Sequence, residues 1–166
     1  MIITGATGFI GRHLVPLFLG AGHDVIAVGR SAGKASQFEW ARRVEFVELD
    51  LKEGAEKLDV PTDASLIHLA WSGLPNYKEV FHFEESLPQS YQFLKACVNK
   101  GVSHVLAVGT CFEYGFRSGP IAPNVNPNPN NPYGFAKDAL RRQLEFLSRQ
   151  IPFCLQWARL FYVYGE

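Results

Sequence analysis

A strand-like segment at the start of the chain runs directly into three regularly spaced glycines. In "MIITGATGFIG", Gly5, Gly8 and Gly11 follow an apolar run and precede residues that recur at helical spacing. Such a turn is typical of a parallel βαβ unit that binds a dinucleotide, since the glycines permit a tight turn, close approach of a pyrophosphate and close packing of the helix. The alternative is a plain strand-to-helix turn that needs glycine for positive φ. No Gly-Lys-Ser/Thr triplet follows, which excludes a P-loop.

Apolar runs and helical periodicities alternate along the rest of the chain. Strands are expected over residues 1–4, 24–29, 44–49, 65–71, 104–110 and 153–161. Helices are expected over residues 10–18, 31–43, 77–99 and 133–147, with kinks at Pro16 and Pro88. Alternating elements with short connections, and strands too apolar to face water, predict a Rossmann-type α/β fold, a doubly wound parallel sheet with helices on both faces. We expect a single domain over residues 1–166.

The composition is that of a globular protein without net charge. Hydrophobic residues make up 47% of the chain, and 16 Lys and Arg balance 16 Asp and Glu. This balance predicts no attraction to nucleic acid or to an acidic membrane, and from the residues at its start we expect neither a cleaved leader nor a membrane-spanning run. Cys97, Cys111 and Cys154 are far apart, lie among apolar residues and form no CxxC pair, and the histidines and acids make no metal signature. We therefore expect a soluble cytoplasmic protein with reduced thiols and no bound metal.

The residue that follows the second predicted strand bears on the choice of cofactor. In a dinucleotide-binding unit, an acidic residue near this point would bond the ribose hydroxyls of NAD. The sequence instead reads "VGRS", and the guanidinium of Arg30 suits a 2′-phosphate because it can form a bidentate pair with it. NADP is therefore predicted in preference to NAD. The alternative is that Arg30 is a solvated loop cation.

The sequence "YGFAK" places a tyrosine and a lysine one helical turn apart. Tyr133 and Lys137 are at i and i+4 near the start of a predicted helix, so they project from the same face. Such residues are commonly no more than a solvated pair. Downstream of a dinucleotide-binding turn they have a chemical use, because an adjacent ammonium stabilises a phenolate and lowers the tyrosine pKa from its ordinary value of about 10.

With these motifs the sequence resembles the extended short-chain dehydrogenase/reductase family, in its NAD(P)-dependent nucleotide-sugar epimerase, dehydratase and reductase branch. The resemblance covers essentially the whole chain and rests on "TGATGFIG", Asp50, "HLAW", "GTCFEYG", "PYGFAK" and "ARLFYVYG". It implies ketone–alcohol chemistry on a nucleotide-sugar by hydride transfer. The implied catalytic residues are Thr110, Tyr133 and Lys137. The implied cofactor contacts are Gly5, Thr7, Gly8, Phe9, Ile10, Gly11, Arg30, Asp50, Leu51, Leu69, Ala70, Tyr133 and Lys137.

The residues after the threonine of "GTCFEYG" narrow the reaction. Dehydratases of the resembled family carry an Asp-Glu pair there, which removes a proton and expels water. This sequence has Cys111 and Phe112 instead, and Glu113 comes one residue too late, in a strand-like segment that would point it away from Phe112. We therefore expect chemistry without loss of water. Cys111 is expected to be a packing residue, with a substrate contact as the alternative.

The sequence departs from the resembled family at two places. Ser86 stands where the central helix of such enzymes usually carries an asparagine, and the chain stops at "YVYGE", where relatives continue into a smaller lobe that closes over the nucleotide-sugar. A missing lobe predicts nucleotide binding with little turnover, and it leaves apolar residues 160–162 uncovered, which predicts a homo-oligomer. The leading hypothesis is the cofactor-binding domain of a nucleotide-sugar reductase or epimerase. The alternative is an NADP(H)-binding module or truncated homologue without turnover.

Overall fold

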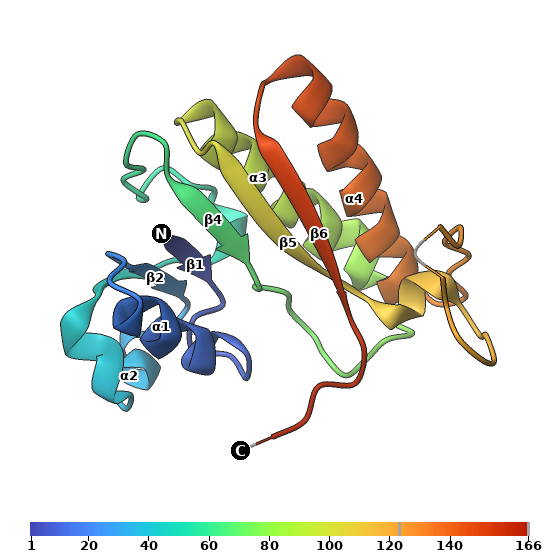
Figure 1. Ribbon diagram of the computed structural model, residues 1–166, viewed down its shortest axis with the longest axis horizontal. Helices are drawn as coiled ribbons and strands as arrows, with labels where there is room; N and C mark the ends of the chain where they lie inside the picture. The colour runs from blue at the N-terminus through green and yellow to red at the C-terminus, as the bar shows by residue number, and fades with distance from the viewer. Residues whose placement is uncertain (123, 166) are drawn as a thin grey trace.

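A computed structural model describes residues 1–122 and 124–165 of the chain. Its centre is a six-stranded sheet in the order β3-β2-β1-β4-β5-β6, in which every neighbouring pair is parallel (Figure 1). The strand order reverses between β1 and β4, and the crevice at the carboxyl ends of such a pair is where ligands bind in sheets of this kind. The predicted Rossmann-type α/β fold is confirmed.

The strands occupy the predicted apolar runs. They are β1 (Ile2–Thr4), β2 (Ile26–Gly29), β3 (Glu45–Glu48), β4 (Ser65–His68), β5 (His104–Thr110) and β6 (Cys154–Leu160). The α-helices are α1 (Gly11–Gly20), α2 (Ala32–Ala35), α3 (Leu87–Asn99) and α4 (Pro132–Gln150). Three short 3₁₀ helices are η1 (Glu39–Arg43), η2 (Leu51–Glu53) and η4 (Cys111–Tyr114), and η3 (His82–Ser86) is a π-helical turn. None of the helices within the described ranges has both the length and the apolar character that crossing a membrane requires.

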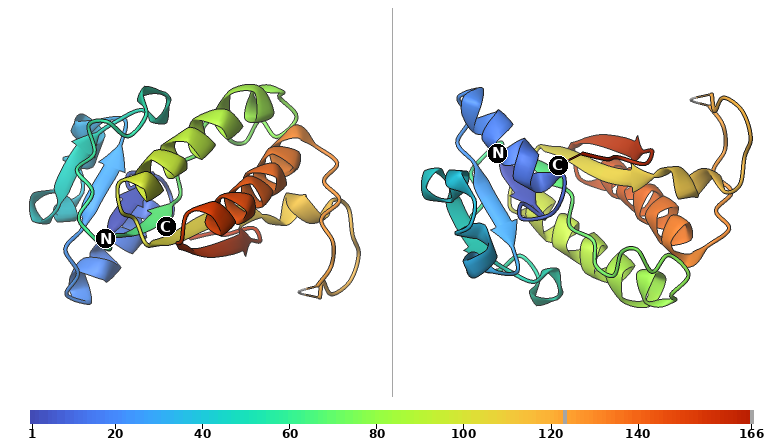
Figure 2. Two further views of the ribbon diagram at one scale, coloured as in Figure 1. Left: turned by 90° about the horizontal axis from the view of Figure 1, so that it is seen from above. Right: turned by 90° about the horizontal axis from the view of Figure 1, so that it is seen from below.

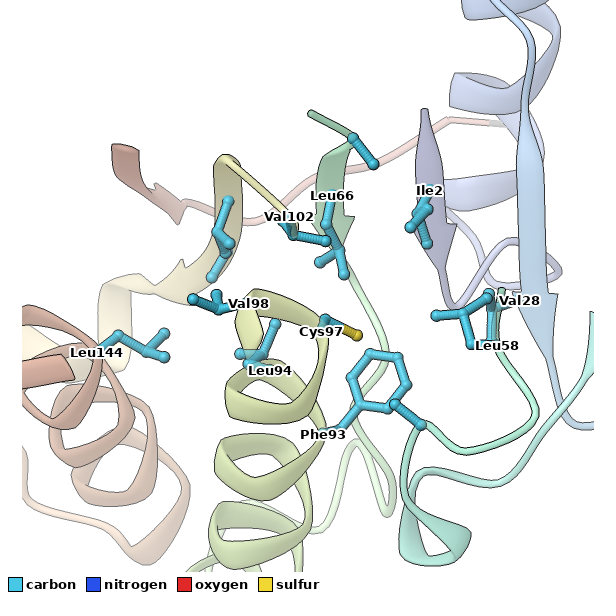
Figure 3. Close-up of a cluster of buried hydrophobic side chains, with 14 of the residues drawn as sticks. Ile2, Val28, Leu58, Leu66, Phe93, Leu94, Cys97, Val98, Val102 and Leu144 are labelled. Carbon is cyan, nitrogen blue, oxygen red and sulfur yellow. The ribbon is translucent and has the colours of Figure 1, made fainter. Parts of the chain in front are cut away.

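Helices cover both faces of the sheet (Figure 2). On one face α1 and α2 enclose a smaller apolar cluster, and on the other face α3 and α4 enclose a larger one. Figure 3 shows the larger cluster, in which α3 presents Phe93, Leu94 and Cys97 to Ile2 of β1 and Leu66 of β4. Burial of each large side chain of this kind contributes roughly 1.5 to 3 kcal/mol, so this cluster anchors α3 beneath the crevice.

The three thiols are unpaired, as predicted, but their surroundings differ. Cys97 is fully buried, and the loss of solvent raises the pKa of its thiol to about 12, so it behaves as an apolar core residue. Cys111 is half-buried and Cys154 is exposed on the edge strand β6. Apolar neighbours along the sequence therefore do not imply burial for Cys154.

The helix predicted over residues 31–43 is broken in two. It ends at Ala35 and resumes as η1, because Phe38 and Trp40 both join the smaller apolar cluster, where their rings stack with centroids 5.1 Å apart. Residues two apart point to different sides of an α-helix, so a continuous helix could not bury both. Packing of these two rings in the core therefore breaks the helix that the local sequence pattern predicts.

The two prolines occupy different positions in their helices. Pro16 lies inside α1, and Pro88 is the second residue of α3, directly after the wider π turn η3. The helix predicted from residue 77 begins instead with the π turn η3, which passes directly into α3.

Beyond β6 the chain runs back past the carboxyl ends of the strands (Figure 1). Phe161, Tyr162 and Tyr164 are 51%, 78% and 94% exposed, whereas Leu160 is half-buried at the end of β6. The predicted exposure of apolar side chains is thus found at Phe161 and Tyr162 but not at Leu160. Self-association through this segment remains a prediction.

Candidate active site

A cleft of about 210 Å³ lies where β1, β2 and β4 end. Its lining includes these predicted cofactor residues: Gly5, Thr7, Gly8, Arg30, Asp50, Leu51, Leu69 and Ala70. The predicted contacts Phe9, Ile10 and Gly11 are not part of this lining, and neither are Tyr133 and Lys137. The structure therefore brings most of the predicted cofactor set together in one cleft and places the tyrosine and lysine beside it.

The glycine turn has the backbone geometry expected from the sequence. Gly5 has φ of 68°, and a Cβ there would lie 2.9 Å from the nitrogen of Ala70. The Gly8 N–H donates to the Gly5 carbonyl at 2.9 Å, which closes the turn. A side chain on Gly11 would collide with the Gly5 carbonyl and with Ala6, so this glycine lets α1 approach the turn. Gly5 and Gly11 thus meet the steric requirements of a dinucleotide turn.

The N-terminus of α1 follows directly on the glycine turn. Ile10 is the N-cap residue, and its side chain cannot accept a hydrogen bond from the first turn. The helix dipole favours an anion near this end, although the Arg12 and His13 N–H groups already donate to the Gly8 and Ile10 carbonyls at 3.0 and 3.1 Å. Phe9 is 42% exposed and packs against the His13 ring, with centroids 6.1 Å apart. Its side chain therefore contacts α1 and does not contribute to the cleft.

Charged side chains of both signs border the cleft beyond β2 and β3. Arg30 and Lys34 both line it and are exposed. Asp50 also lines it, and its carboxylate accepts a backbone hydrogen bond at 3.2 Å. Glu48 pairs in register with the residue before Arg30, and its carboxylate accepts the Ala32 N–H at 2.7 Å. Reasoning from the sequence missed Glu48 and Lys34, because neither is a neighbour of Arg30 along the chain.

The cleft is also lined by hydroxyl and amide groups, and of these the sequence singled out Ser86 alone. Its polar residues from β1, from the segment after β4 and from the start of α3 are Thr4, Ser72, Ser86, Gln89 and Ser90. The Ser72 and Ser86 hydroxyls are 3.1 Å apart, so Ser86 belongs to the cleft even though it replaces the expected asparagine. Among the described residues, no group of His, Cys, Asp or Glu is arranged to hold a metal ion.

The start of α4 is shaped to present Tyr133. Asn131 caps the helix by accepting the Gly134 N–H at 2.8 Å, and Pro132 occupies the first turn. A side chain on Gly134 would collide with the carbonyl of Phe112, so this glycine lets α4 approach η4 closely. The tyrosine is thereby placed next to the residues that follow β5.

The Tyr133 ring lies in an aromatic pocket and is only 7% exposed. Its centroid is 5.1 Å from that of His82 and 5.5 Å from that of Tyr77. Burial raises the pKa of Tyr133 to about 12, although a hydrogen bond with Thr110 acts in the opposite direction. The predicted lowering of this pKa is therefore wrong, because loss of solvent outweighs the hydrogen bond with Thr110; the Lys137 Nζ lies 6.0 Å from the ring centroid.

Lys137 is almost fully buried, one turn along α4. Its Nζ donates to the Val108 carbonyl of β5 at 2.9 Å and lies 4.0 Å from the centroid of the Trp71 ring. Loss of solvent lowers the pKa of Lys137 to about 7, and the Glu113 carboxylate partly opposes this change. Trp71 also lines the cleft, so the lysine and the cleft share one aromatic wall.

Thr110 ends β5, and Glu113 fixes the turn that follows it. The Thr110 Oγ1 accepts the Phe112 N–H at 3.3 Å, and the Glu113 carboxylate accepts the Thr110 N–H at 2.9 Å. This buried carboxylate also accepts from Arg159 Nε at 2.6 Å and from Trp157 Nε1 at 3.1 Å. The prediction of a strand-like Glu113 is wrong, because the segment forms a capping box whose T-x-x-E spacing was visible in the sequence.

Comparisons with known proteins agree with this geometry. The family described as "NAD dependent epimerase/dehydratase family" matches residues 1–166. The chain belongs to this family. Among the family's curated members, a dTDP-6-deoxy-L-talose 4-dehydrogenase (NAD(+)) from Aggregatibacter actinomycetemcomitans is 34% identical over 168 residues, covering 100% of this chain and 62% of that protein. The resemblance to extended short-chain dehydrogenases/reductases is thereby confirmed.

Solved structures show the same fold. MoeE5 in complex with UDP-glucuronic acid and NAD superposes with a TM-score of 0.80 at 30% identity, over 99% of this chain and 55% of that one. A UDP-galactose 4-epimerase superposes with a TM-score of 0.83 at 24% identity, over 95% of this chain and 54% of that one. The chain thus spans a little over half the length of these family members. NAD, not NADP, is the nucleotide named for the dehydrogenase and for MoeE5, so the predicted preference for NADP is not confirmed.

Proposed function

We propose that this chain binds a nicotinamide dinucleotide in the cleft and provides the proton-transfer group for ketone–alcohol interconversion on a nucleotide-sugar. The observation that carries the proposal is the position of Tyr133 and Lys137 against the wall of the cleft. Trp71 lines the cleft, and its ring lies 4.0 Å from the Lys137 Nζ and 6.0 Å from the Tyr133 centroid. The named activities of the dehydrogenase and epimerase relatives support this class of reaction.

Each proposed catalytic residue has a role that follows from its surroundings. A bound nicotinamide supplies or accepts the hydride. Burial keeps Tyr133 protonated at neutral pH, so its phenol has a proton to donate to a carbonyl oxygen that becomes an alcohol. The Thr110 hydroxyl can donate a hydrogen bond or accept one, so it can bond the reacting oxygen both as a carbonyl and as an alcohol. In the direction of oxidation a phenolate is needed, and the hydrogen bond with Thr110 lowers the pKa of Tyr133 and so favours it.

The same residues favour chemistry without loss of water. Eliminating water from a sugar requires a base and an acid beside the reacting carbons. Cys111 and Phe112 supply no carboxyl group, and the Phe112 ring packs against Tyr77 with centroids 4.7 Å apart. The carboxylate of Glu113 is already engaged by Arg159. We therefore propose an epimerase or dehydrogenase reaction and not a dehydratase reaction.

For the cofactor, we propose NAD as the principal ligand of the cleft and NADP as a second one. The names of the relatives support NAD. Asp50 could accept hydrogen bonds from ribose hydroxyls, whereas Arg30 and Lys34 could pair with a 2′-phosphate. Because cationic and acidic side chains lie at the same end of the cleft, we expect only a modest difference between the affinities for NAD and NADP.

Binding and turnover of the purified 166-residue chain test the proposal. Titration with NADH should show saturable binding. Tyr133→Phe should leave that affinity within about twofold and lower the single-turnover reduction of a nucleotide-ketosugar at least ~10²-fold. Tyr164→Phe is the matched control, because this tyrosine is 94% exposed, and it should change neither quantity. A chain that binds no nicotinamide nucleotide would refute the proposal, and binding without any turnover would identify a cofactor-binding module.

A further inference from the structure

An indole and an imidazole that the proposed chemistry does not use lie beside the lysine. Trp71 follows β4, and its Nε1–H donates to the Nδ1 of His82 at 3.0 Å. His82 is fully buried in the π turn η3, and its Nε2 lies 3.0 Å from the carbonyl oxygen of Asn76. The three groups form a continuous chain of hydrogen bonds from the wall of the cleft to the loop after β4.

These contacts decide which nitrogen of His82 carries the proton. An indole N–H can only donate, so the Nδ1 of His82 must present its lone pair to Trp71. The proton is therefore on Nε2, which donates to the Asn76 carbonyl. Burial lowers the pKa of His82, which favours this neutral form. A neutral imidazole with both nitrogens engaged holds the indole of Trp71 in one orientation.

The indole held in this way presents its face to an ammonium that has few other partners. The Lys137 Nζ lies 4.0 Å from the Trp71 ring centroid and is 2% exposed. Within the part of the chain that the structure describes, its hydrogen-bond acceptor is the Val108 carbonyl, which leaves two of the three ammonium N–H donors without one. The face of a tryptophan ring attracts a cation most strongly when both are removed from water, so the ring favours the charged form of the lysine.

We propose that Trp71 is a positioning residue for Lys137, whose ammonium it holds by the face of its indole, and that His82 sets the orientation of that face. The inference rests on the proposed function in taking Lys137 as the lysine that acts on Tyr133. Trp71 also lines the cleft, so the ring that contacts the lysine is part of the cleft wall. A ligand that moves this ring would change the environment of the ammonium directly.

The protonation of Lys137 can be followed without turnover or cofactor. In the 166-residue chain labelled with ¹³C-lysine, the Cε resonance of Lys137, assigned with Lys137→Met, is titrated over about pH 5 to 11. Trp71→Leu removes the aromatic face and should weaken proton binding by Lys137 about tenfold or more, whereas Trp71→Phe should retain most of it. Trp40→Phe is the matched control, because this buried indole lies in the other apolar cluster and should leave the titration unchanged.

The contribution of His82 is tested by a pair of variants. His82→Gln can still accept the Trp71 N–H and donate to the Asn76 carbonyl, so the indole proton resonance and the Lys137 titration should be kept. His82→Leu can do neither, so it should shift that resonance and weaken proton binding by Lys137. If Trp71→Leu does not fold, the two His82 variants still test whether the orientation of the indole affects proton binding by Lys137.

An unchanged Lys137 titration in folded Trp71→Leu, or in His82→Leu, would overturn the inference. The outcome is separable from that of the proposed function, because the titration involves no substrate. If Lys137 responds to Trp71 as expected but Tyr133→Phe remains fully active, the proposed function fails and the positioning role of Trp71 stands.

Discussion

Replacement of Lys137 by methionine should make the folded protein more stable at neutral pH, although it removes a proposed catalytic group. Burial lowers the pKa of this lysine from 10.5 to about 7. At about 1.36 kcal/mol per pKa unit, the buried site disfavours the ammonium by roughly 5 kcal/mol relative to water, which is an upper limit. The methionine loses the contacts with the Val108 carbonyl and the Trp71 face, so we expect a net gain of about 2 kcal/mol.

This gain should depend on pH with a definite sign. Between about pH 7 and 10.5 the unfolded chain keeps the proton of Lys137 while the folded protein releases it. Stability rises with pH wherever the unfolded state binds more protons, so the wild-type protein gains stability through this window from this group. Methionine does not titrate. The advantage of Lys137→Met should therefore be largest at or below pH 7 and should shrink as the pH approaches 10.5.

Urea unfolding at pH 6.5 and at pH 9.5 measures both effects. Lys100→Met is a suitable control, because the Lys100 ammonium is exposed and donates to the carbonyls of Ala55 and Leu58 at 2.6 and 2.9 Å. That variant should lose about 1 kcal/mol at both pH values. The reasoning is refuted if Lys137→Met is less stable than the wild-type protein at pH 6.5, or if its advantage does not shrink at pH 9.5.

Three further predictions concern the buried carboxylate, the cofactor and the product. Glu113→Gln should lower the free energy of unfolding by about 3 kcal/mol, because it leaves the mostly buried guanidinium of Arg159 without its carboxylate partner. Glu145→Gln is the control in the same urea experiment, and it should cost less than about 1 kcal/mol because the Glu145 side chain is 45% exposed. Arg30→Ala should weaken NADPH binding about tenfold and NADH binding less than threefold; equal losses in fluorescence titration would show that Arg30 does not contact the 2′-phosphate. With Cys111 and Phe112 in place of an acid–base pair, mass spectrometry should find that a nucleotide-hexose keeps its water, and a product lighter by one water would contradict this.

The parts of the site that could be predicted are those set by short stretches of chain. The glycine spacing constrains the backbone locally, and Gly5 indeed has positive φ while Gly11 allows close packing. The four-residue spacing of Tyr133 and Lys137 likewise fixes a shared helix face, and both side chains are buried. In each case the constraint acts within one or two helical turns.

The parts that could not be predicted depend on how distant segments meet. The ion pair of Glu113 with Arg159 exists because Gly109 and Arg159 are in register on neighbouring strands. Trp71 and His82 meet across a loop without periodicity. The direction of the Tyr133 pKa was predicted wrongly for the same reason, since the depth of burial is a property of the folded chain.

The central claim is that the cleft holds a nicotinamide dinucleotide next to the tyrosine and lysine. The most direct test is an NMR titration of the 166-residue chain with NAD, following the backbone amides of Gly8 and Gly11, the Cε resonance of Lys137 and that of Lys100 as a remote control. The resonances of Gly8, Gly11 and Lys137 should shift together along a single binding curve while that of Lys100 does not move. If NAD shifts none of the first three, or shifts Lys100 instead, the cleft is not the nucleotide site beside Tyr133 and Lys137.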